Sequence, residues 1–275
     1  MEQNTVENAT SVEGLINYLE FTGERPANYM YEPPAGVPAR SGRSNKHTMR
    51  VYDGRGAHLT LDGQGFAFVH HTSKVVDFYD PDEVQRVYYP EVAQLVMDVT
   101  GAIRVHVFDH NVRNRTMSKA GLNGAREPIK FAHNDYTLKS GPKRVRDLLG
   151  EDAEELLKHR FAEINVWRPI RGPVEESPIA VCDARSMTLA DFVATDLKYR
   201  DCTGEVYSVA FNPKHRWYYF PRMRPDEALL LKCYDSADDG RARFTAHTGF
   251  DDPSSPLDAA PRESIEARML VFFRE

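Results

Sequence analysis

Short apolar runs separated by turn residues dominate the second half of the chain. In several of them apolar and polar positions alternate with a period of two, which is the pattern of a strand with one buried face. Turns such as Asn212-Pro213 and Asp238-Asp239-Gly240 stand between them. Many short strands with this punctuation are typical of a β-sandwich or β-barrel rather than a doubly wound α/β sheet. The strands predicted in this half cover residues 164–167, 179–182, 206–211, 217–220, 228–234, 243–250 and 264–273.

Two helical segments interrupt the first half of the chain. After Pro90, apolar residues recur at positions i, i+3, i+4 and i+7 until Gly101. This predicts a helix that packs one apolar stripe against the outside of a sheet. Between Pro142 and His159 a similar spacing predicts a helical excursion that is interrupted at Gly150. The expected fold class is therefore mainly β with flanking helices.

The N-terminal region has a different character. Residues 1–45 are polar and proline-bearing, so we expect them to wrap over the surface rather than fold alone. The basic stretch from Arg40 to Arg55 also contains glycine, serine and asparagine, which favours a solvated loop. Strands are then expected within residues 51–76 and over residues 103–108 and 128–137. We predict one domain over residues 1–275, with the surface segment 1–45 followed by a core over residues 46–275 that contains the helical insertions.

Composition and charge narrow the class of protein. Hydrophobic residues make up 41% of the 275 positions and the mean hydropathy is -0.54, which describes a globular chain with enough apolar material for one core. The formal charge of -6 is spread over interspersed acidic and basic residues, so neither nucleic acid nor an anionic membrane is a predicted partner.

Targeting signals and cysteines point to a cell compartment. The acidic start of the chain has no secretory-signal pattern, and no apolar run reaches the ~18 residues that a membrane span needs. Cys182, Cys202 and Cys233 are too few and too widely spaced for a disulfide framework or a metal knuckle. We therefore predict a cytoplasmic protein with free thiols.

One motif carries metal-binding chemistry. His133-Asn134-Asp135 is the only His-x-Asp in the chain, and residues i and i+2 of a strand point to the same side about 6.6 Å apart. Two imidazoles and one carboxylate form the facial triad that holds non-haem iron(II) and leaves coordination positions open. The second histidine has three candidates: His159, His215 and His247. His159 falls at a helix end and His215 in a turn, whereas His247 is favoured by the residues that follow it.

The last predicted strand supplies those residues. Its even-numbered positions share one face; they are Arg262, Ser264, Glu266 and Arg268. A buried guanidinium needs an anionic partner and matches a carboxylate in a planar, bidentate way. Arg262 and Ser264 are therefore predicted to hold the distal carboxylate of 2-oxoglutarate. The alternative is that Arg262 or Arg268 pairs with Glu266 or another acidic side chain of the protein.

These features resemble the iron(II)/2-oxoglutarate oxygenases, and more specifically the cephem methoxylase/gibberellin desaturase-like family, also called CmcJ/NvfI-like. The resemblance covers the chain from about Val51 to its end. The segments that carry it are Tyr89-Pro90-Glu91, Val107-Phe108-Asp109-His110, Asn165-Val166-Trp167-Arg168-Pro169, Asp226-Glu227-Ala228, Tyr234-Asp235-Ser236, His247-Thr248-x-Phe250 and Pro261-Arg262-x-Ser264-Ile265-Glu266-x-Arg268.

The resemblance implies a fold, cofactors and a reaction. It implies a double-stranded β-helix core (jelly roll, cupin-like) that uses Fe(II), 2-oxoglutarate and molecular oxygen. It also implies hydroxylation, desaturation or cyclisation of a small molecule, either a specialised metabolite or an amino-acid-like compound. Fifteen positions separate His247 from Arg262, a longer gap than is usual in such enzymes, so Arg268 remains a second candidate for the co-substrate anchor.

Further side chains are candidates for the walls of the site. Asn165 and Tyr207 are expected to contact 2-oxoglutarate. The predicted substrate pocket consists of Trp167, Arg168, His215, Trp217, Tyr219 and Tyr136. Aromatic residues at period two are at least as often core packing, so each of these has a purely structural alternative.

Two other classes of protein remain open from the residues alone. A zinc hydrolase also uses two histidines and an aspartate with an open water position, but it gives no role to the Arg-x-Ser pair. A non-catalytic β-sandwich binding module would leave His133 and His247 as ordinary polar residues. Metal analysis, combined with a test for succinate release, separates these alternatives.

Overall fold

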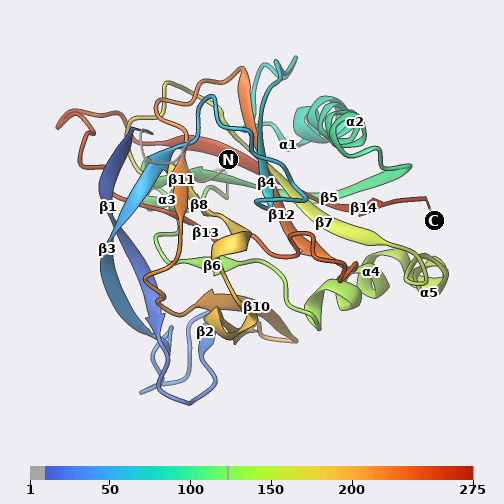
Figure 1. The fold of residues 1–275 in the computed structure, drawn as a ribbon, viewed down its shortest axis with the longest axis horizontal. Helices are drawn as coiled ribbons and strands as arrows, with labels where there is room; N and C mark the ends of the chain where they lie inside the picture. The colour runs from blue at the N-terminus through green and yellow to red at the C-terminus, as the bar shows by residue number, and fades with distance from the viewer. Residues whose placement is uncertain (1–9, 123, 275) are drawn as a thin grey trace.

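The computed structural model describes residues 10–122 and 124–274, whose strands form two sheets (Figure 1). In spatial order the nine-stranded sheet contains β1 (Ser11–Glu20), β3 (Arg43–Asp53), β11 (Trp217–Tyr219), β8 (Ile179–Cys182), β13 (His247–Gly249), β6 (His133–Asn134), β10 (Thr203–Val209), β9 (Phe192–Lys198) and β2 (Ala27–Tyr29). The five-stranded sheet contains β4 (Phe66–His70), β12 (Glu227–Asp235), β7 (Phe161–Pro169), β14 (Glu263–Phe272) and β5 (Arg104–Asn114). The predicted mainly β chain is confirmed.

The five-stranded sheet buries both of its faces. Its strands β7 and β14 pair in an antiparallel ladder along most of their length. On β14, Ile265 and Met269 pack in a cluster with helix α2 (Tyr89–Thr100). Leu270 and Phe272 point the other way and share a cluster with Val181 of the nine-stranded sheet. Period-two alternation along β14 thus separates an outer, helix-covered face from an inner face between the sheets.

Helix α2 forms as the apolar spacing predicts. Val92 and Val96 are fully buried against the five-stranded sheet, and Figure 1 shows the helix on the outer side of this sheet. Gly101 ends the helix with a left-handed φ of 71°, and its amide donates to the Met97 carbonyl. Burying this stripe, rather than helix propensity alone, holds α2 in place.

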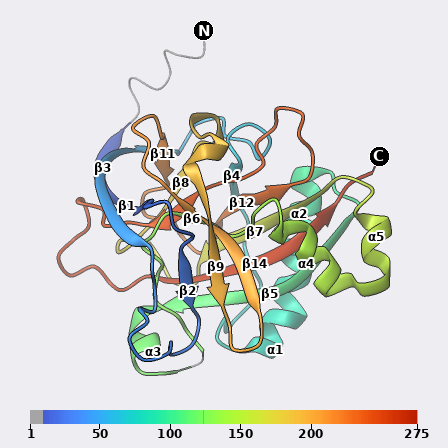
Figure 2. The same cartoon turned by 90° about the horizontal axis from the view of Figure 1, so that it is seen from below.

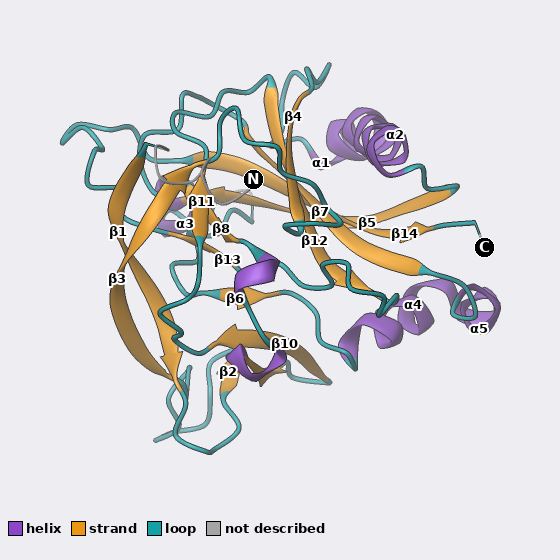
Figure 3. Cartoon of the chain, in the orientation of Figure 1, coloured by secondary structure: helices purple, strands orange, loops and turns teal. Residues whose placement is uncertain are grey.

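The other helices are short and lie mainly at the periphery, as Figure 3 shows for α4 and α5. The predicted excursion folds as α4 (Ser140–Leu149), a 3-10 turn η3 (Gly150–Asp152) and α5 (Ala153–Leu156), with the interruption at Gly150. The remaining helical elements are α1 (Pro81–Glu83), η2 (Val84–Tyr88), α3 (Arg115–Lys119), η4 (Ala184–Ser186) and η5 (Leu189–Asp191). No described helix is long and apolar enough to cross a bilayer.

The N-terminal segment departs from its prediction. Instead of wrapping over the surface, residues 11–20 form strand β1, which pairs with β3 and buries Ile16 and Tyr18 completely. The buried positions Gly14, Ile16 and Tyr18 alternate, so the period-two signal is present but is masked by its polar neighbours. Residues 1–9 of the predicted segment lie outside the described residues.

The basic stretch is also a strand rather than a solvated loop. Residues 43–53 form β3, in which Met49 and Val51 are buried and Arg50 is exposed. The charged side chains therefore occupy the solvent face, and the alternation with buried apolar residues appears only near the end of the strand.

Strands around the site are shorter than the sequence predicts. The strand expected over residues 128–137 pairs only at His133 and Asn134, and the one expected over 243–250 pairs only at 247–249. In contrast, β9 was not predicted, although it lies beside β10 and β2 in the same sheet (Figure 2). In β6 and β13, strand pairing is thus limited to the two histidines and their immediate neighbours.

Candidate metal centre

Two short strands bring distant residues together. His133 on β6 lies directly opposite His247 on β13, and Asp135 follows β6. The ligand atoms of these three side chains all lie within 4.8 Å of one another. His133 Nε2 is 3.6 Å from Asp135 Oδ1, and the two imidazole centroids are 4.4 Å apart. The predicted triad therefore converges, and neither His159 nor His215 belongs to this cluster.

The backbone sets the tautomer of both histidines. His133 Nδ1 lies 2.8 Å from the Phe131 carbonyl oxygen, and His247 Nδ1 lies 3.1 Å from the Thr245 carbonyl oxygen. Because a carbonyl only accepts, each Nδ1 carries the hydrogen and each Nε2 keeps its lone pair. Such a second interaction fixes the orientation of a metal-binding imidazole.

The protonation states of His133 and Asp135 suit metal binding. Burial, with a smaller contribution from the neighbouring His247, lowers the pKa of His133 to about 4. Burial alone would raise the pKa of Asp135, but the two histidines, Arg268 and Asn165 outweigh it and bring the pKa down to about 2. At neutral pH, His133 is neutral and Asp135 is ionised, as metal ligands must be. Two neutral nitrogens and one carboxylate fit iron(II) with open positions.

A buried corner with unpartnered hydrogen-bond donors adjoins the triad. Arg262 and Ser264 are buried, and Arg262 Nη1 comes close to Gly249, two residues after His247. Its guanidinium stacks over the Trp167 ring and donates only to the Ser177 carbonyl, at 2.5 Å. Arg262 Nε and Ser264 Oγ have no hydrogen-bond partner among the described residues. A carboxylate of a ligand would accept hydrogen bonds from both donors and would balance the charge of the guanidinium.

The second candidate anchor is already paired. Arg268 forms a two-pronged ion pair with Asp109 on the neighbouring strand β5, with Nε 2.6 Å from Oδ1. Arg262 has no carboxylate within ion-pair distance among the described residues, so the alternative of an internal ion pair applies to Arg268. Burial lowers the pKa of Arg262 to about 10, with a contribution from nearby Arg113.

Asn165 occupies a different place from the one predicted. Its Nδ2 donates to Asp135 Oδ2 at 2.7 Å and to Glu266 Oε1 at 2.6 Å, which uses both amide hydrogens. Its remaining polar atom, Oδ1, is an acceptor and cannot bond to a carboxylate. Both hydrogens of the Asn165 amide are therefore used within the protein, one of them on the predicted metal ligand Asp135.

Three other predicted residues lie on the inner side of the sheets. Trp167 is buried beneath Arg262, and Tyr136 is buried with its hydroxyl unpartnered among the described residues. Tyr207 packs against Phe192 and Phe244, and its strand β10 pairs with β6. These side chains share the apolar cluster between the sheets.

Arg168 faces away from this space. It alternates with Asn165 and Trp167 along β7 and is buried on the outer side of the sheet, where it donates to the His71 carbonyl and stacks over Tyr88. Its prediction as a pocket residue is therefore corrected. The alternation was visible in the sequence, but a buried arginine on the helix-covered face was not expected.

The predicted pocket residues on and near β11 lie away from the metal-ligand candidates. Trp217 donates to the Tyr18 hydroxyl at 2.6 Å, His215 stacks on Tyr18, and Tyr219 packs against Phe250. They belong to a separate cluster on the other face of the nine-stranded sheet, whereas Tyr218 faces inward. Because apolar residues occupy both faces of β11, alternation could not tell which face is inner.

The sequence analysis missed two charged residues near the site. Arg113 on β5 lies opposite Ser264, and its Nη1 donates to the Glu127 carbonyl at 2.8 Å. Burial lowers the pKa of Arg113, while the charges of Glu266 and Asp135 oppose that shift. Arg113 therefore interacts electrostatically with the metal-ligand candidate Asp135. Glu163 is fully buried on β7. Only the pairing of β5, β14 and β7 reveals these neighbours.

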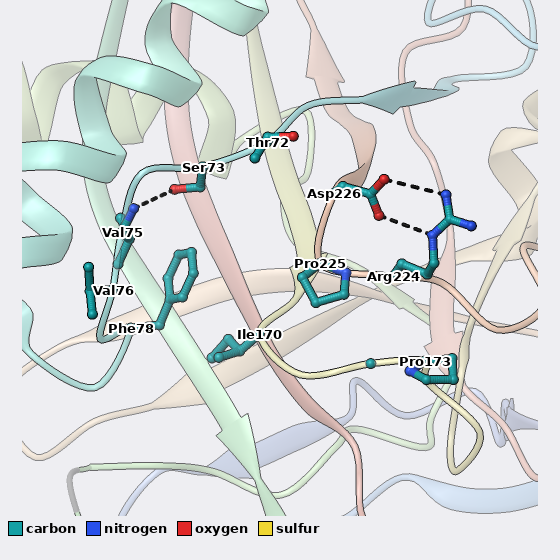
Figure 4. Close-up of a pocket in the computed structure, with 11 residues that line it drawn as sticks. Thr72, Ser73, Val75, Val76, Phe78, Ile170, Pro173, Arg224, Pro225 and Asp226 are labelled. Carbon is teal, nitrogen blue, oxygen red and sulfur yellow. Dashed lines mark hydrogen bonds and ion pairs between the residues drawn. The ribbon is translucent and has the colours of Figure 1, made fainter.

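A separate surface groove of about 420 Å³ lies away from the triad, whose residues take no part in its lining. Val75, Phe78, Ile170 and Pro225 contribute to its walls, and an Arg224–Asp226 ion pair stands at one side (Figure 4).

Comparisons with known proteins identify the family to which the chain belongs. Residues 16–272 match the family model described as Oxidoreductase/YMDC permease-like domain. The hydroxylase/desaturase CTB9 of Cercospora beticola is 36% identical over 83% of this chain and 77% of its own length. The Fe(II)/2-oxoglutarate-dependent dioxygenase nvfI of Aspergillus novofumigatus is 34% identical over 89% of this chain and 90% of its own. A solved structure of the iron and alpha-ketoglutarate-dependent endoperoxidase NvfI superposes with a TM-score of 0.88 at 30% identity, covering 97% of this chain and 99% of that one.

The jelly-roll fold and its His-Asp-His cluster define an Fe(II)/2-oxoglutarate-dependent oxygenase, and the predicted fold class, cofactors and enzyme class are confirmed. Its partners include molecular oxygen and a small-molecule substrate. The chain belongs to the cephem methoxylase/gibberellin desaturase-like family, also called CmcJ/NvfI-like.

Proposed function

We propose that His133, Asp135 and His247 hold the iron and that the enzyme oxidises an unactivated carbon of a small specialised metabolite. The observation that carries this proposal is the convergence of two lone-pair Nε2 atoms and one ionised carboxylate within 4.8 Å. Relatives named as hydroxylase/desaturase and as 2-oxoglutarate-dependent dioxygenase support oxidation as the reaction. Iron(II) with bound 2-oxoglutarate and oxygen supplies an oxidant strong enough to remove hydrogen from carbon.

Arg262 and Ser264 are proposed to anchor the distal carboxylate of 2-oxoglutarate. Arg262 Nε and Ser264 Oγ are buried donors without partners among the described residues, and a carboxylate would satisfy both. Arg113, opposite Ser264, adds positive charge that favours a dianion at this corner. Arg268 keeps its ion pair with Asp109 and shapes the potential around Asp135.

The inner apolar cluster would provide the substrate pocket. Trp167, Tyr136 and Tyr207 belong to this cluster between the sheets and would exclude water from the reacting carbon. The outcome, whether hydroxylation, desaturation or cyclisation, follows from where the substrate carbon lies relative to the metal.

We further propose that the enzyme works in the cytoplasm. Cys182, Cys202 and Cys233 are all free thiols, as expected in a reducing compartment.

The test combines metal analysis with succinate formation. Purified protein is reconstituted anaerobically with Fe(II) or Zn(II), exposed to 2-oxoglutarate and oxygen, and screened with candidate metabolites. We expect succinate release with Fe(II) only, stimulated by an oxidisable substrate. Hydrolysis supported by Zn(II), or the absence of succinate with every metal, would reject the proposal.

A further inference from the structure

Asn165 links the half-buried Asp135 carboxylate to the buried Glu266 carboxylate between the sheets. Its side chain is fully buried on β7, and its Nδ2 bonds Asp135 Oδ2 on one side and Glu266 Oε1 on the other. The orientation of the amide is unambiguous, because a flipped group would place Oδ1 against two acceptor oxygens. Both hydrogen bonds are charge-assisted and are stronger than neutral ones.

The two oxygens of Asp135 therefore have different environments. Oδ1 faces His133 Nε2 at 3.6 Å, on the side where the ligand atoms converge. Oδ2 is turned toward β7 and is held there by Asn165. Rotation of the carboxylate that brought both oxygens to a metal would break the amide contact.

Asn165 itself has little freedom to follow such a rotation. It lies inside the five-stranded sheet, opposite Leu231 on β12 and Arg268 on β14. Glu266, on the adjacent strand, holds the second amide hydrogen, so any tilt of Asn165 costs a second charge-assisted hydrogen bond. The amide is consequently a rigid constraint on Asp135.

We propose that Asn165 is a positioning residue that restricts Asp135 to a single metal-binding oxygen and so keeps the oxygen-binding position open. This rests on the proposed function. The triad would leave coordination positions for the 2-oxo acid and, last, for oxygen. A carboxylate binding through both oxygens would occupy that last position.

The experiment uses nitric oxide as a stand-in for oxygen. Protein loaded anaerobically with Fe(II) and 2-oxoglutarate is titrated with nitric oxide, and the iron–nitrosyl complex is followed by electron paramagnetic resonance. We expect Asn165→Leu to bind nitric oxide about tenfold more weakly, the equilibrium effect of losing one charge-assisted hydrogen bond. Affinity for Fe(II) and for 2-oxoglutarate should change much less.

A second variant guards against misfolding. Asn165→Leu leaves Glu266 buried without its partner, so the double variant Asn165→Leu/Glu266→Gln removes that charge while Asp135 stays unrestrained. The matched control is Asn114→Leu, which removes another buried asparagine whose amide bonds to the Tyr79 hydroxyl. It should bind nitric oxide as the wild type does.

The outcomes separate the two proposals. If wild-type protein binds neither Fe(II) nor 2-oxoglutarate, the proposed function fails. If it binds both, and the Asn165 variants bind nitric oxide as tightly as wild type, the positioning role is rejected. A loss confined to 2-oxoglutarate affinity would likewise reject it and would make Asn165 a co-substrate contact.

Discussion

At the residue scale, a hydrogen bond with the rest of the protein fixes the orientation of each proposed metal ligand. His133 and His247 each donate Nδ1–H to a carbonyl two residues earlier in the chain, and Asp135 accepts from Asn165. The three ligands are thus preset in protonation and direction before a metal arrives, which lowers the cost of binding it.

Replacing one ligand should abolish tight iron binding. His247→Ala removes one Nε2 donor and leaves two, so we expect Fe(II) affinity to fall by at least about a hundredfold, beyond the range seen for supporting residues. Anaerobic Fe(II) titration measures this. The exposed His58 supplies the control, because His58→Ala should bind iron as the wild type does. Equal affinities of both variants would contradict the triad.

The two C-terminal arginines should respond differently to truncation. Arg262→Leu removes the unpaired buried cation and should weaken 2-oxoglutarate binding by about tenfold or more while Fe(II) binding persists. Arg268→Leu should instead leave 2-oxoglutarate binding nearly unchanged and destabilise the fold slightly, because the Asp109 carboxylate is 40% exposed and water can solvate it once its partner is lost. Calorimetric titration of iron-loaded protein, together with urea unfolding, distinguishes the two effects. A larger loss of co-substrate binding in Arg268→Leu would reverse the assignment.

Glu163 should make stability depend on pH. Burial raises its pKa well above the ordinary 4.5, with Arg144 and Arg268 opposing and Asp135 reinforcing the shift. Between the ordinary and the raised pKa the folded state binds more protons than the unfolded state, so the free energy of unfolding falls as pH rises.

Glu163→Gln should therefore gain stability over wild type as pH rises above about 4.5. The gap should widen by at most about 1.4 kcal/mol per pH unit. Urea unfolding of both metal-free proteins measures this difference in the free energy of unfolding. The range runs from about pH 4, near the ordinary pKa of glutamate, to about pH 7. A gap that stays constant with pH would show that Glu163 is ionised in the folded state.

At the element scale, short segments of backbone position the histidines. Thr245 supplies the carbonyl that holds His247 Nδ1, and the Thr245 hydroxyl donates to the Gly65 carbonyl at 2.6 Å. Gly65 has a φ of +91°, and a Cβ there would lie 2.2 Å from Thr245 Oγ1. The turn before β4 is therefore coupled through Thr245 to the strand that carries a metal ligand.

Gly65→Ala tests this coupling. The left-handed backbone costs about 1–2 kcal/mol for a non-glycine residue, and displacement of Thr245 adds to it, so both stability and Fe(II) affinity should fall. Gly240→Ala is the matched control, since Gly240 has a φ of +97° with nothing within 4 Å of the added Cβ. Thermal unfolding and iron titration of both variants should show the iron defect only at Gly65.

At the scale of the whole molecule, the site joins the two sheets. His133 and His247 come from the nine-stranded sheet, while Asn165 and Arg262 come from or adjoin strands of the five-stranded sheet. The Asn165–Asp135 hydrogen bond crosses between them. All three metal ligands belong to the nine-stranded sheet or follow its strands, so a metal would stabilise the folded arrangement that brings them together.

Metal removal should consequently lower global stability. Fe(II) at a hundred times its dissociation constant should stabilise the folded state by about 2.7 kcal/mol, provided it binds only the folded protein. Anaerobic thermal unfolding with and without a chelator measures this shift. The same addition to His247→Ala should have little effect, and an equal shift in that variant would place the stabilising metal elsewhere.

The sequence by itself determined which residues carry the chemistry, because His-x-Asp, the later histidine and Arg-x-Ser are local patterns of chemically distinctive side chains. It also determined α2 and which residues of β14 share a face, since amphipathic periodicity follows directly from helix and strand geometry. Only the tertiary structure decided that Arg168 and Trp217 face away from the site, that β1 joins the sheet, and that Asn165 binds Asp135. Those outcomes depend on strand pairing between distant segments and on which face of a doubly buried sheet is inner, and period-two alternation specifies neither.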